Sequence, residues 1–301
     1  MNFLKKIKVA VHDGTFHTDD VLSVAILQTY LKKSVKVFRT RDPKVFKKMD
    51  YLLDVGREYN PKENKFDHHE EGWNEKRANG MIYATSGLLW KEFGEKITGS
   101  KESADIVDKK VIQGIDSDDN GIVLFKNTFE DVSLYGFSDF IYSLNNTYKE
   151  KNKDNNKNFD VAVVYAQKML EREIKRAQDF VSGIEKMKKI YDDTEDKRII
   201  VLDDDYSWRK FFANYPEPLF VIKPSLDEAK TWRIYAVGMK GEKFKNKMDL
   251  PESWAGKTDE QLQKITGVPD AIFCHNKRFM ASAGSKNGAI VLAKLTIDFK
   301  G

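Results

Sequence analysis

Histidine and aspartate residues gather near the start of this chain. Four of its five histidines lie within the first 69 residues, and each stands beside carboxylates. The residues form three stretches: His12 to Asp20, Asp54, and Asp67 to Glu70. Imidazole and carboxylate groups are the ligands that hydrolytic sites use for divalent metal ions. A thiolate-rich zinc site is excluded, because the chain has a single cysteine.

Each stretch on its own is also compatible with a structural role. A lone histidine at a strand end is often a hydrogen-bonded core residue, and an acid before glycine, as near Asp54, is common in turns. The adjacent pair His68 and His69 is more specific in a chain with so few histidines. Three such stretches, each next to an apolar run, favour a metal site.

The flanking segments predict how these stretches come together. A β-prone run, Ile7 to Val11, ends directly before His12, and a second run, Asp50 to Gly56, contains Asp54. The apolar spacing of Val21 to Leu31 is typical of a helix that packs on a sheet. In open α/β sheets, ligands bind at the carboxyl ends of parallel strands. We therefore expect His12 and Asp54 at the carboxyl ends of neighbouring parallel strands.

A fourth acidic stretch follows an amphipathic segment at Val107 to Ile115. It runs from Gly114 to Gly121 and contains Asp116. An ordinary polar turn is the alternative interpretation. A helix-loop-helix calcium loop is excluded, because such a loop needs an acid at its twelfth position and Asn127 stands there when counting starts at Asp116. We expect Asp116 to complete the metal site.

Taken together, these motifs resemble a known family. The stretches His12 to Asp20, Phe66 to His69 and Gly114 to Gly121 are similar to those of the melanocyte proliferating gene one family, within the DHH phosphoesterase superfamily. Members of that family are described as metal-dependent hydrolases and 3′-to-5′ RNA exonucleases. Further landmarks extend the resemblance over nearly the whole chain: Ser86 to Trp90, Trp232 to Ile234, Leu250 to Trp254, Gly267 to Pro269, and Phe273 to His275.

The resemblance implies a site with two Mn²⁺ or Mg²⁺ ions that activate a water for attack on phosphorus. One ion would be held by His12, His17 and Asp54. The other would be held by four residues, with Asp54 bridging the two ions: Asp19, Asp54, His68 and Asp116. His69 would contact the scissile phosphate or the leaving oxygen. Asp67 would orient a histidine through its ring N–H.

The resemblance also implies substrate contacts, most of them in the C-terminal part. Residues 275–289 correspond to a glycine-rich, basic loop before a helix over 288–295, where unpaired N–H groups form a phosphate cradle. An ordinary loop before a core helix is the alternative. The chain departs from the family pattern at two places. Ala281-Ser282 replaces a pair of glycines, and Gly284 replaces a basic residue. The expected substrate-binding residues are Ser86, Arg233, His275, Lys277, Arg278, Ser285 and Lys286.

The expected fold class is α/β, in three parts. Residues 1–148 form a DHH-like catalytic domain with a parallel sheet, and residues 149–195 form a mobile loop over 149–158 and a connecting helix over 159–191. The apolar stripe of that helix fits an intrachain core better than a dimer interface. Residues 196–301 form a smaller α/β domain with a mixed sheet, and the catalytic cleft is expected between the domains. The strands of this C-terminal domain are expected at 198–202, 219–222, 233–237 and 271–274, and its helices at 258–266 and 288–295.

The expected function is that of a metal-dependent hydrolase, a 3′-to-5′ exonuclease on single-stranded RNA or short oligonucleotides. Alternatives are a phosphoesterase for pyrophosphate, a cyclic dinucleotide or a nucleotide, or a non-enzymatic metal-binding protein of the same fold. The net charge of +4 permits a nucleic-acid partner without requiring one. No stretch approaches the roughly 20 apolar residues of a membrane span, and Cys274 has no disulfide partner in the chain, so a cytoplasmic protein is expected. A homodimer through the connecting helix is the alternative to its role in an intrachain core.

Overall fold

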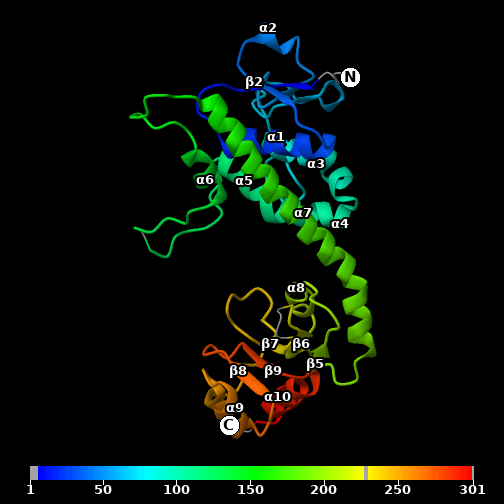
Figure 1. Cartoon of the computed structure of the whole chain (residues 1–301). Helices are drawn as coiled ribbons and strands as arrows, with labels where there is room; N and C mark the ends of the chain where they lie inside the picture. The colour runs from blue at the N-terminus through cyan, green and yellow to red at the C-terminus, as the bar shows by residue number, and fades with distance from the viewer. Residues whose placement is uncertain (1–5, 130, 227–229, 300–301) are drawn as a thin grey trace, which may run out of the picture. The chain divides into compact units, whose positions relative to one another are not determined.

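The computed structural model describes residues 6–129, 131–226 and 230–299 of an α/β protein (Figure 1). Its contacts divide the chain into two compact units, Met1–Gln178 and Asp179–Gly301. Helix α7 (Asn155–Asp193) runs through this boundary, so the predicted connecting segment contributes to both units. It starts inside the stretch 149–158, whose last four residues are therefore helical rather than a loop.

The first unit contains the predicted parallel sheet. Its strand order is β2-β1-β3-β4, and every pairing is parallel. The central strands are β1 (Lys8–Val11) and β3 (Tyr51–Leu53), so His12 and Asp54 follow neighbouring parallel strands, as predicted. The outer strands β2 (Lys36–Arg39) and β4 (Lys65–Phe66) were not predicted, because they are short and carry charged residues.

Helices pack around this sheet and bury its apolar residues. Helix α1 starts at Thr18 and is fully buried through Leu27, and it packs against α3. The helical elements of the first unit are α1 (Thr18–Leu31), α2 (Pro43–Phe46), η1 (Pro61–Glu63), α3 (Thr85–Thr98), α4 (Lys101–Val107), the π-helical η2 (Asp108–Ile112), α5 (Gln113–Asp119) and α6 (Phe137–Ser143). The acidic stretch around Asp116 is thus part of helix α5 and not a polar turn.

The two ends of the apolar stripe of α7 lie in intrachain cores, as the favoured interpretation predicted. Leu170, Ile174 and Ala177 belong to the core of the first unit. Met187 and Tyr191 belong to a core of the second unit. Val181 and Ile184, between these residues, are half-buried and belong to neither core, and a homodimer stays a prediction.

The second unit has the predicted mixed sheet, in the order β5-β6-β7-β9-β8. Strands β5 and β6 are parallel, and the other pairings are antiparallel. The strands are β5 (Ile199–Val201), β6 (Phe220–Pro224), β7 (Trp232–Ala236), β8 (Ala271–Cys274) and β9 (Met280–Ala283). The helical elements are α8 (Arg209–Phe212), η3 (Glu252–Trp254), α9 (Asp259–Thr266) and α10 (Lys286–Asp298). Strand β9 lies within the segment 275–289 that was expected to be a loop.

Helices cover both faces of this second sheet. Leu292 and Ala293 of α10 pack with Ile234 and Ala281 on one face. Trp208, Phe212 and the end of α7 pack with Tyr235 on the other. Within the described ranges, no helix combines the length and the apolar character that crossing a membrane requires.

Candidate metal centre

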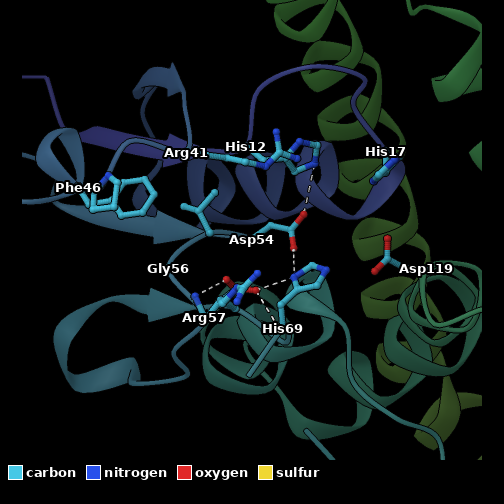
Figure 2. A pocket seen from close by; sticks show the side chains of 12 residues that line it. His12, His17, Arg41, Phe46, Asp54, Gly56, Arg57, His69 and Asp119 are labelled. Carbon is cyan, nitrogen blue, oxygen red and sulfur yellow. Dashed lines mark hydrogen bonds and ion pairs between the residues drawn. The ribbon is translucent and has the colours of Figure 1, made fainter. Parts of the chain in front are cut away.

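The carboxyl edge of the parallel sheet positions the acidic and histidine residues. His12 follows β1, Asp54 follows β3, and Asp67 follows β4. Helix α1 adds Asp19 in its first turn. Residues from four segments therefore meet at one edge of the sheet, and Figure 2 shows the pocket above it.

Asp54 is the central residue of this cluster. Its backbone has a φ of 55°, in the left-handed region that aspartate and asparagine adopt more readily than most residues. The side chain is buried, and its two carboxylate oxygens lie between two sets of imidazoles. Oδ2 is 3.5 Å from His12 Nε2, and Oδ1 is 3.7 Å from His68 Nδ1. Oδ1 also accepts a hydrogen bond from Thr85 Oγ1 at 3.3 Å.

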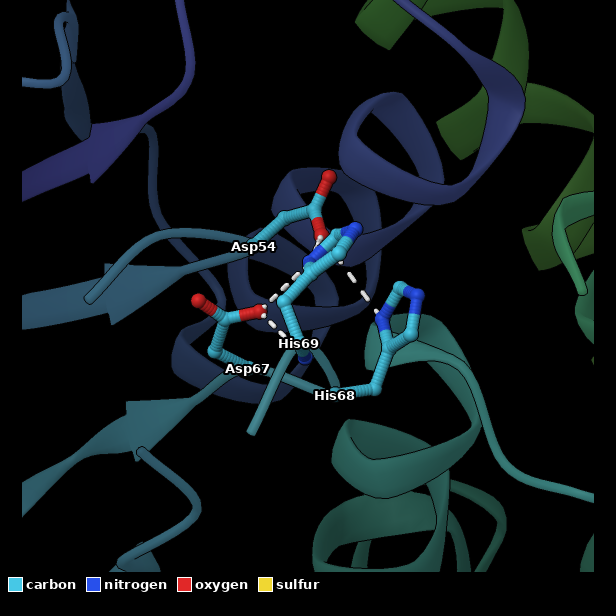
Figure 3. Close-up of side chains that lie close together, drawn as sticks. All are labelled: Asp54, Asp67, His68 and His69. Atoms are coloured by element: carbon cyan, nitrogen blue, oxygen red, sulfur yellow. Dashed lines mark hydrogen bonds and ion pairs between the residues drawn. The ribbon is translucent and has the colours of Figure 1, made fainter. Parts of the chain in front are cut away.

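Two overlapping groups of side chains could each hold a metal ion. The first consists of Asp54, Asp67, His68 and His69, which come together in Figure 3. The second consists of Asp19, His68 and Asp119. Within each group the possible ligand atoms all lie within 4.8 Å of one another, which is compatible with a shared ion. His17 lines the same pocket, and its ring centroid is 5.3 Å from that of His12.

The histidine tautomers leave ring nitrogens free for a cation. His12 Nδ1 donates to the Asp13 carbonyl at 3.0 Å, which leaves a lone pair on Nε2. That nitrogen is 3.1 Å from Asp20 Oδ2, and both buried atoms lack a hydrogen bond of good geometry. His68 Nδ1 contacts Thr85 Oγ1, and its Nε2 is 3.1 Å from Asp119 Oδ2. Two acceptor atoms at such distances need a proton or a cation between them.

The crowding of these groups changes their protonation. Burial, and then the negative charges of Asp119 and Asp54, raise the pKa of Asp19 well above its ordinary value. Burial and the charge of Asp20 raise the pKa of Asp54 to about 6. A divalent cation would reverse these effects, because it stabilises the charged carboxylates. The donor set is therefore one that fits hard divalent cations such as Mn²⁺ or Mg²⁺.

The surroundings of Asp116 differ from those expected of a metal ligand. Its Oδ2 is 2.6 Å from Arg77 Nη1, and its Oδ1 accepts hydrogen bonds from Ser86 Oγ and the Gly87 N–H. Its carboxylate is thus occupied by protein groups at the start of α3. Asp119, one helical turn further along α5, instead faces His68.

The surroundings of Ser86 also differ from those expected of a substrate-binding residue. It is fully buried, and its N–H donates to Asp19 Oδ1 at 2.7 Å. The Thr85 N–H donates to Asp19 Oδ2 at 3.0 Å. The first turn of α3 therefore holds Asp19 and Asp116 in place, as the positive end of a helix dipole favours.

Asp67 has the orienting geometry that was expected of it. Its Oδ1 is 2.8 Å from His69 Nδ1 and also accepts the His69 N–H, and its Oδ2 accepts the Arg57 N–H at 2.6 Å. Burial raises the pKa of Asp67, but these hydrogen bonds outweigh that effect and hold it below its ordinary value. The hydrogen bond to Asp67 in turn raises the pKa of His69, whose side chain is exposed to the pocket.

The expected substrate residues of the second unit fall into two groups. His275, Lys277 and Arg278 lie at the turn before β9, where His275 Nδ1 accepts the Lys277 N–H. Ser285 and Lys286 lie after β9, at the start of α10.

Arg233 belongs with the second group, because it pairs with Ser282 near the end of β9. Ser285 Oγ caps α10 by accepting the Gly288 N–H at 3.0 Å. The Asp270 carboxylate lies so close to Gly288 that a Cβ there would overlap it. Part of the predicted phosphate cradle is therefore already filled by protein groups.

The pocket above the two groups of possible metal ligands has a volume of about 810 Å³. It brings in residues that the sequence analysis did not single out: Arg41, Pro43, Phe46, Val55, Gly56, Arg57 and Asp119. A smaller hollow of about 350 Å³ lies beside it, lined by His17, Asp119 and Tyr142. For Arg41 the missed signal was its position just after strand β2, at the same edge of the sheet.

Comparison with known proteins gives matches over almost the full length. A family model, MYG1_exonuc, described as an uncharacterised protein family (UPF0160), matches residues 8–297. The MYG1 protein of Chlamydia pneumoniae is 28% identical over 304 residues, covering 97% of each chain. The human MYG1 exonuclease is 26% identical over 327 residues, covering 96% of this chain and 85% of that protein.

One solved structure, a pGpG-specific phosphodiesterase from Vibrio, also aligns with the chain. The alignment covers 98% of this chain and 100% of that one, with 12% identity and a TM-score of 0.32. A likeness that weak supports no argument about this protein.

Proposed function

Because this chain belongs to the MYG1 exonuclease family, as its motifs predicted, we propose that it is a divalent-metal-dependent phosphoesterase that trims single-stranded RNA or short oligonucleotides from the 3′ end. Curated relatives in mammals carry the name exonuclease. Its membership of the DHH superfamily stays a prediction.

The observation that carries the proposal is the pairing of buried acceptor atoms around Asp54. His12 Nε2 faces Asp20 and Asp54, and His68 Nε2 faces Asp119. Such an arrangement is costly in a buried site unless a proton or a metal cation satisfies it, and the crowding of several carboxylates around these imidazoles favours the metal. The carboxylates and imidazoles are therefore best explained as a ligand set.

The proposed ligands form two sets that share Asp54. His12, His17 and Asp54 would hold one ion, and Asp19, Asp54, His68 and Asp119 the other. In this assignment Asp119 replaces Asp116, whose carboxylate is engaged by Arg77. Bound Mn²⁺ or Mg²⁺ would polarise the phosphate and lower the pKa of a water.

The remaining residues of the site have roles of their own. His69 lies at the exposed side of the cluster with a raised pKa, so its protonated ring would donate to the scissile phosphate or the leaving oxygen. Asp67 would hold that ring in place through its hydrogen bond to Nδ1.

A direct test is the hydrolysis of 5′-labelled single-stranded RNA with Mn²⁺, with Mg²⁺ and with EDTA. Pyrophosphate and a dinucleotide serve as small substrates in parallel. The proposal predicts a ladder that shortens from the 3′ end with either metal and stops with EDTA. Asp54→Asn should remove this activity, whereas Asp105→Asn, on the exposed surface of α4, should not.

Other outcomes would lead to the alternatives. Release of phosphate or mononucleotides from the small substrates alone would make the protein a small-molecule phosphoesterase. Intact substrates of every kind, together with tight metal binding, would leave a non-enzymatic metal-binding protein of this fold.

A further inference from the structure

The pocket extends well beyond the residues that could hold metal ions. On one side it ends at Asp119, and on the other it reaches α2, which follows the edge strand β2. In Figure 2, Phe46 and Asp119 stand on opposite sides of Asp54. The part of the pocket next to α2 therefore needs its own explanation.

The wall next to α2 is apolar and contains an aromatic ring. Phe46 is half-buried at the end of α2, and Pro43 at its start also lines the pocket. Val55, directly after Asp54, continues this surface toward the metal groups. An aromatic ring beside a proline is a surface on which a nucleobase can stack, because every base presents a flat π-face.

Two arginines supply positive charge to the same pocket. Arg41 comes from the loop between β2 and α2, and its guanidinium is held by Asp13. Arg57 follows Gly56 after β3, and its N–H donates to Asp67 Oδ2. That hydrogen bond fixes the Arg57 backbone at a φ of 54°, while its side chain is exposed and makes no ion pair within the described part of the chain. Guanidinium groups bind phosphate oxygens with two parallel hydrogen bonds.

We propose that this part of the pocket is a subsite for one nucleotide, with its base against Phe46 and Pro43 and its phosphate beside Arg57. This inference rests on the proposed function and names the substrate unit that the site takes. The whole pocket, with a volume of about 810 Å³, is large enough to hold such a unit beside the residues that could hold metal ions. A pyrophosphate ion would leave the apolar wall uncovered, so a nucleoside phosphate fits the lining better.

The test measures binding of adenosine 5′-monophosphate and of ribose 5-phosphate by equilibrium dialysis, using the full-length protein with Mg²⁺. These two compounds differ at C1′, where the first carries adenine and the second a hydroxyl group. Phe46→Leu should weaken binding of adenosine monophosphate about tenfold and leave that of ribose 5-phosphate unchanged. Phe46→Tyr, which keeps a ring, should retain both affinities.

Matched variants control for indirect effects. Phe38→Leu removes a half-buried ring on the adjacent strand β2 that does not line this pocket, and it should change neither affinity. Arg57→Gln should weaken both ligands about tenfold, because both carry the phosphate. Lys44→Gln, an exposed cation on α2 outside the lining, should change neither.

The proposal is overturned if the two compounds bind equally well to the wild type, or if Phe46→Leu weakens both alike. It is also overturned if Phe46→Tyr loses as much affinity for adenosine monophosphate as Phe46→Leu. Failure of the proposed function is a separate result. In that case no substrate is hydrolysed with any metal, yet the base-dependent binding and its loss in Phe46→Leu persist.

Discussion

Arg77 Nη1 lies 2.6 Å from Asp116 Oδ2, in a pair of which both members are buried. The same guanidinium binds Asp108 through Nε and Nη2 and lies over the ring of Tyr83. Burial raises the pKa of Asp116 to about 6, although the charge of Arg77 acts in the opposite direction. Asp116 therefore positions α3 and α5 against each other, beside the side chains that could hold metal ions.

This relationship predicts different consequences for the two acids of α5. Asp116→Asn removes one of the two carboxylates that Arg77 binds and leaves only Asp108, so it should lower the free energy of unfolding by about 2 kcal/mol. Asp119→Asn should barely change the stability of the metal-free protein and should weaken Mg²⁺ binding more than about tenfold. Urea unfolding in EDTA and metal titration calorimetry measure the two effects. If Asp116→Asn were as stable as the wild type and lost the metal, Asp116 would be the ligand after all.

Asp54→Asn should abolish hydrolysis and weaken the binding of both ions. Its carboxylate lies between the imidazoles of His12 and His68, so no neighbouring acid can replace it. Asparagine tolerates the φ of 55° at this position, so the fold should remain intact. Circular dichroism and single-turnover kinetics with Mn²⁺ provide the measurement. Full activity of this variant would contradict the shared-ligand assignment.

The sequence predicted that these histidines and acids come together because they directly follow apolar strands. Val9 to Val11 and Leu52 to Leu53 are contiguous apolar runs, and parallel pairing of these strands brings His12 and Asp54 together. The alternation of histidine and carboxylate was visible without any knowledge of the fold. The same reasoning located most strands and helices of the second unit.

The partner of each acid on α5 could not be predicted. Asp116 and Asp119 are three residues apart on one helix, and residues at that spacing share a face. The choice between them depends on Arg77, which lies 39 positions before Asp116 in a stretch without apolar periodicity. Strand β9 was missed for a similar reason, because its small residues Ala281 to Ala283 become apolar surface only when α10 covers them.

The stability of the metal-free protein should depend on pH through His12. Burial lowers its pKa, but the Asp20 carboxylate 3.1 Å from Nε2 outweighs burial and raises the pKa to about 9. The charged His12 ring therefore stabilises the fold fully at a pH below about 6.5, its pKa in the unfolded chain. This contribution is lost as the pH rises through about 9. In EDTA, the wild type should thus lose up to about 3 kcal/mol relative to His12→Gln between these values.

The stabilisation of the fold by bound Mg²⁺ should have the opposite dependence on pH over the same range. The ion competes with the proton on His12 Nε2, so its stabilising effect should increase with pH. Urea unfolding at several pH values, with EDTA and with Mg²⁺, gives both curves. Parallel curves for wild type and His12→Gln would show that this imidazole is not linked to folding.

His69→Ala should lower kcat about a hundredfold while Mg²⁺ affinity changes little. The ring is exposed to the pocket, and its Nδ1 is held by Asp67 at 2.8 Å. Asp67→Asn should shift the alkaline limb of the pH profile of kcat to lower pH, because Asp67 raises the pKa of His69. A pH profile unchanged in Asp67→Asn would remove His69 from the role of proton donor.

The two basic groups of the second unit should contribute unequally to substrate binding. Strand β9, four residues or about 13 Å of extended chain, lies between Lys277 and Lys286. Lys286 lies over the ring of Trp232, next to Arg233. Since the two lysines cannot contact the same phosphate, their loss should affect oligonucleotides of different lengths.

We expect Lys286→Gln to raise the KM for a dinucleotide about tenfold, because Lys286 lies at the start of α10 beside Arg233, whereas Arg278, next to Lys277, faces the Asp249 carboxylate. Lys277→Gln should raise KM only for longer oligonucleotides, which offer further phosphates. Steady-state kinetics over oligonucleotides of two to ten residues would separate the two effects. Lys243→Gln, on an exposed lysine outside both groups, is the control for net charge. Equal effects of Lys277→Gln and Lys286→Gln at every length would show that these lysines act only through general electrostatic attraction.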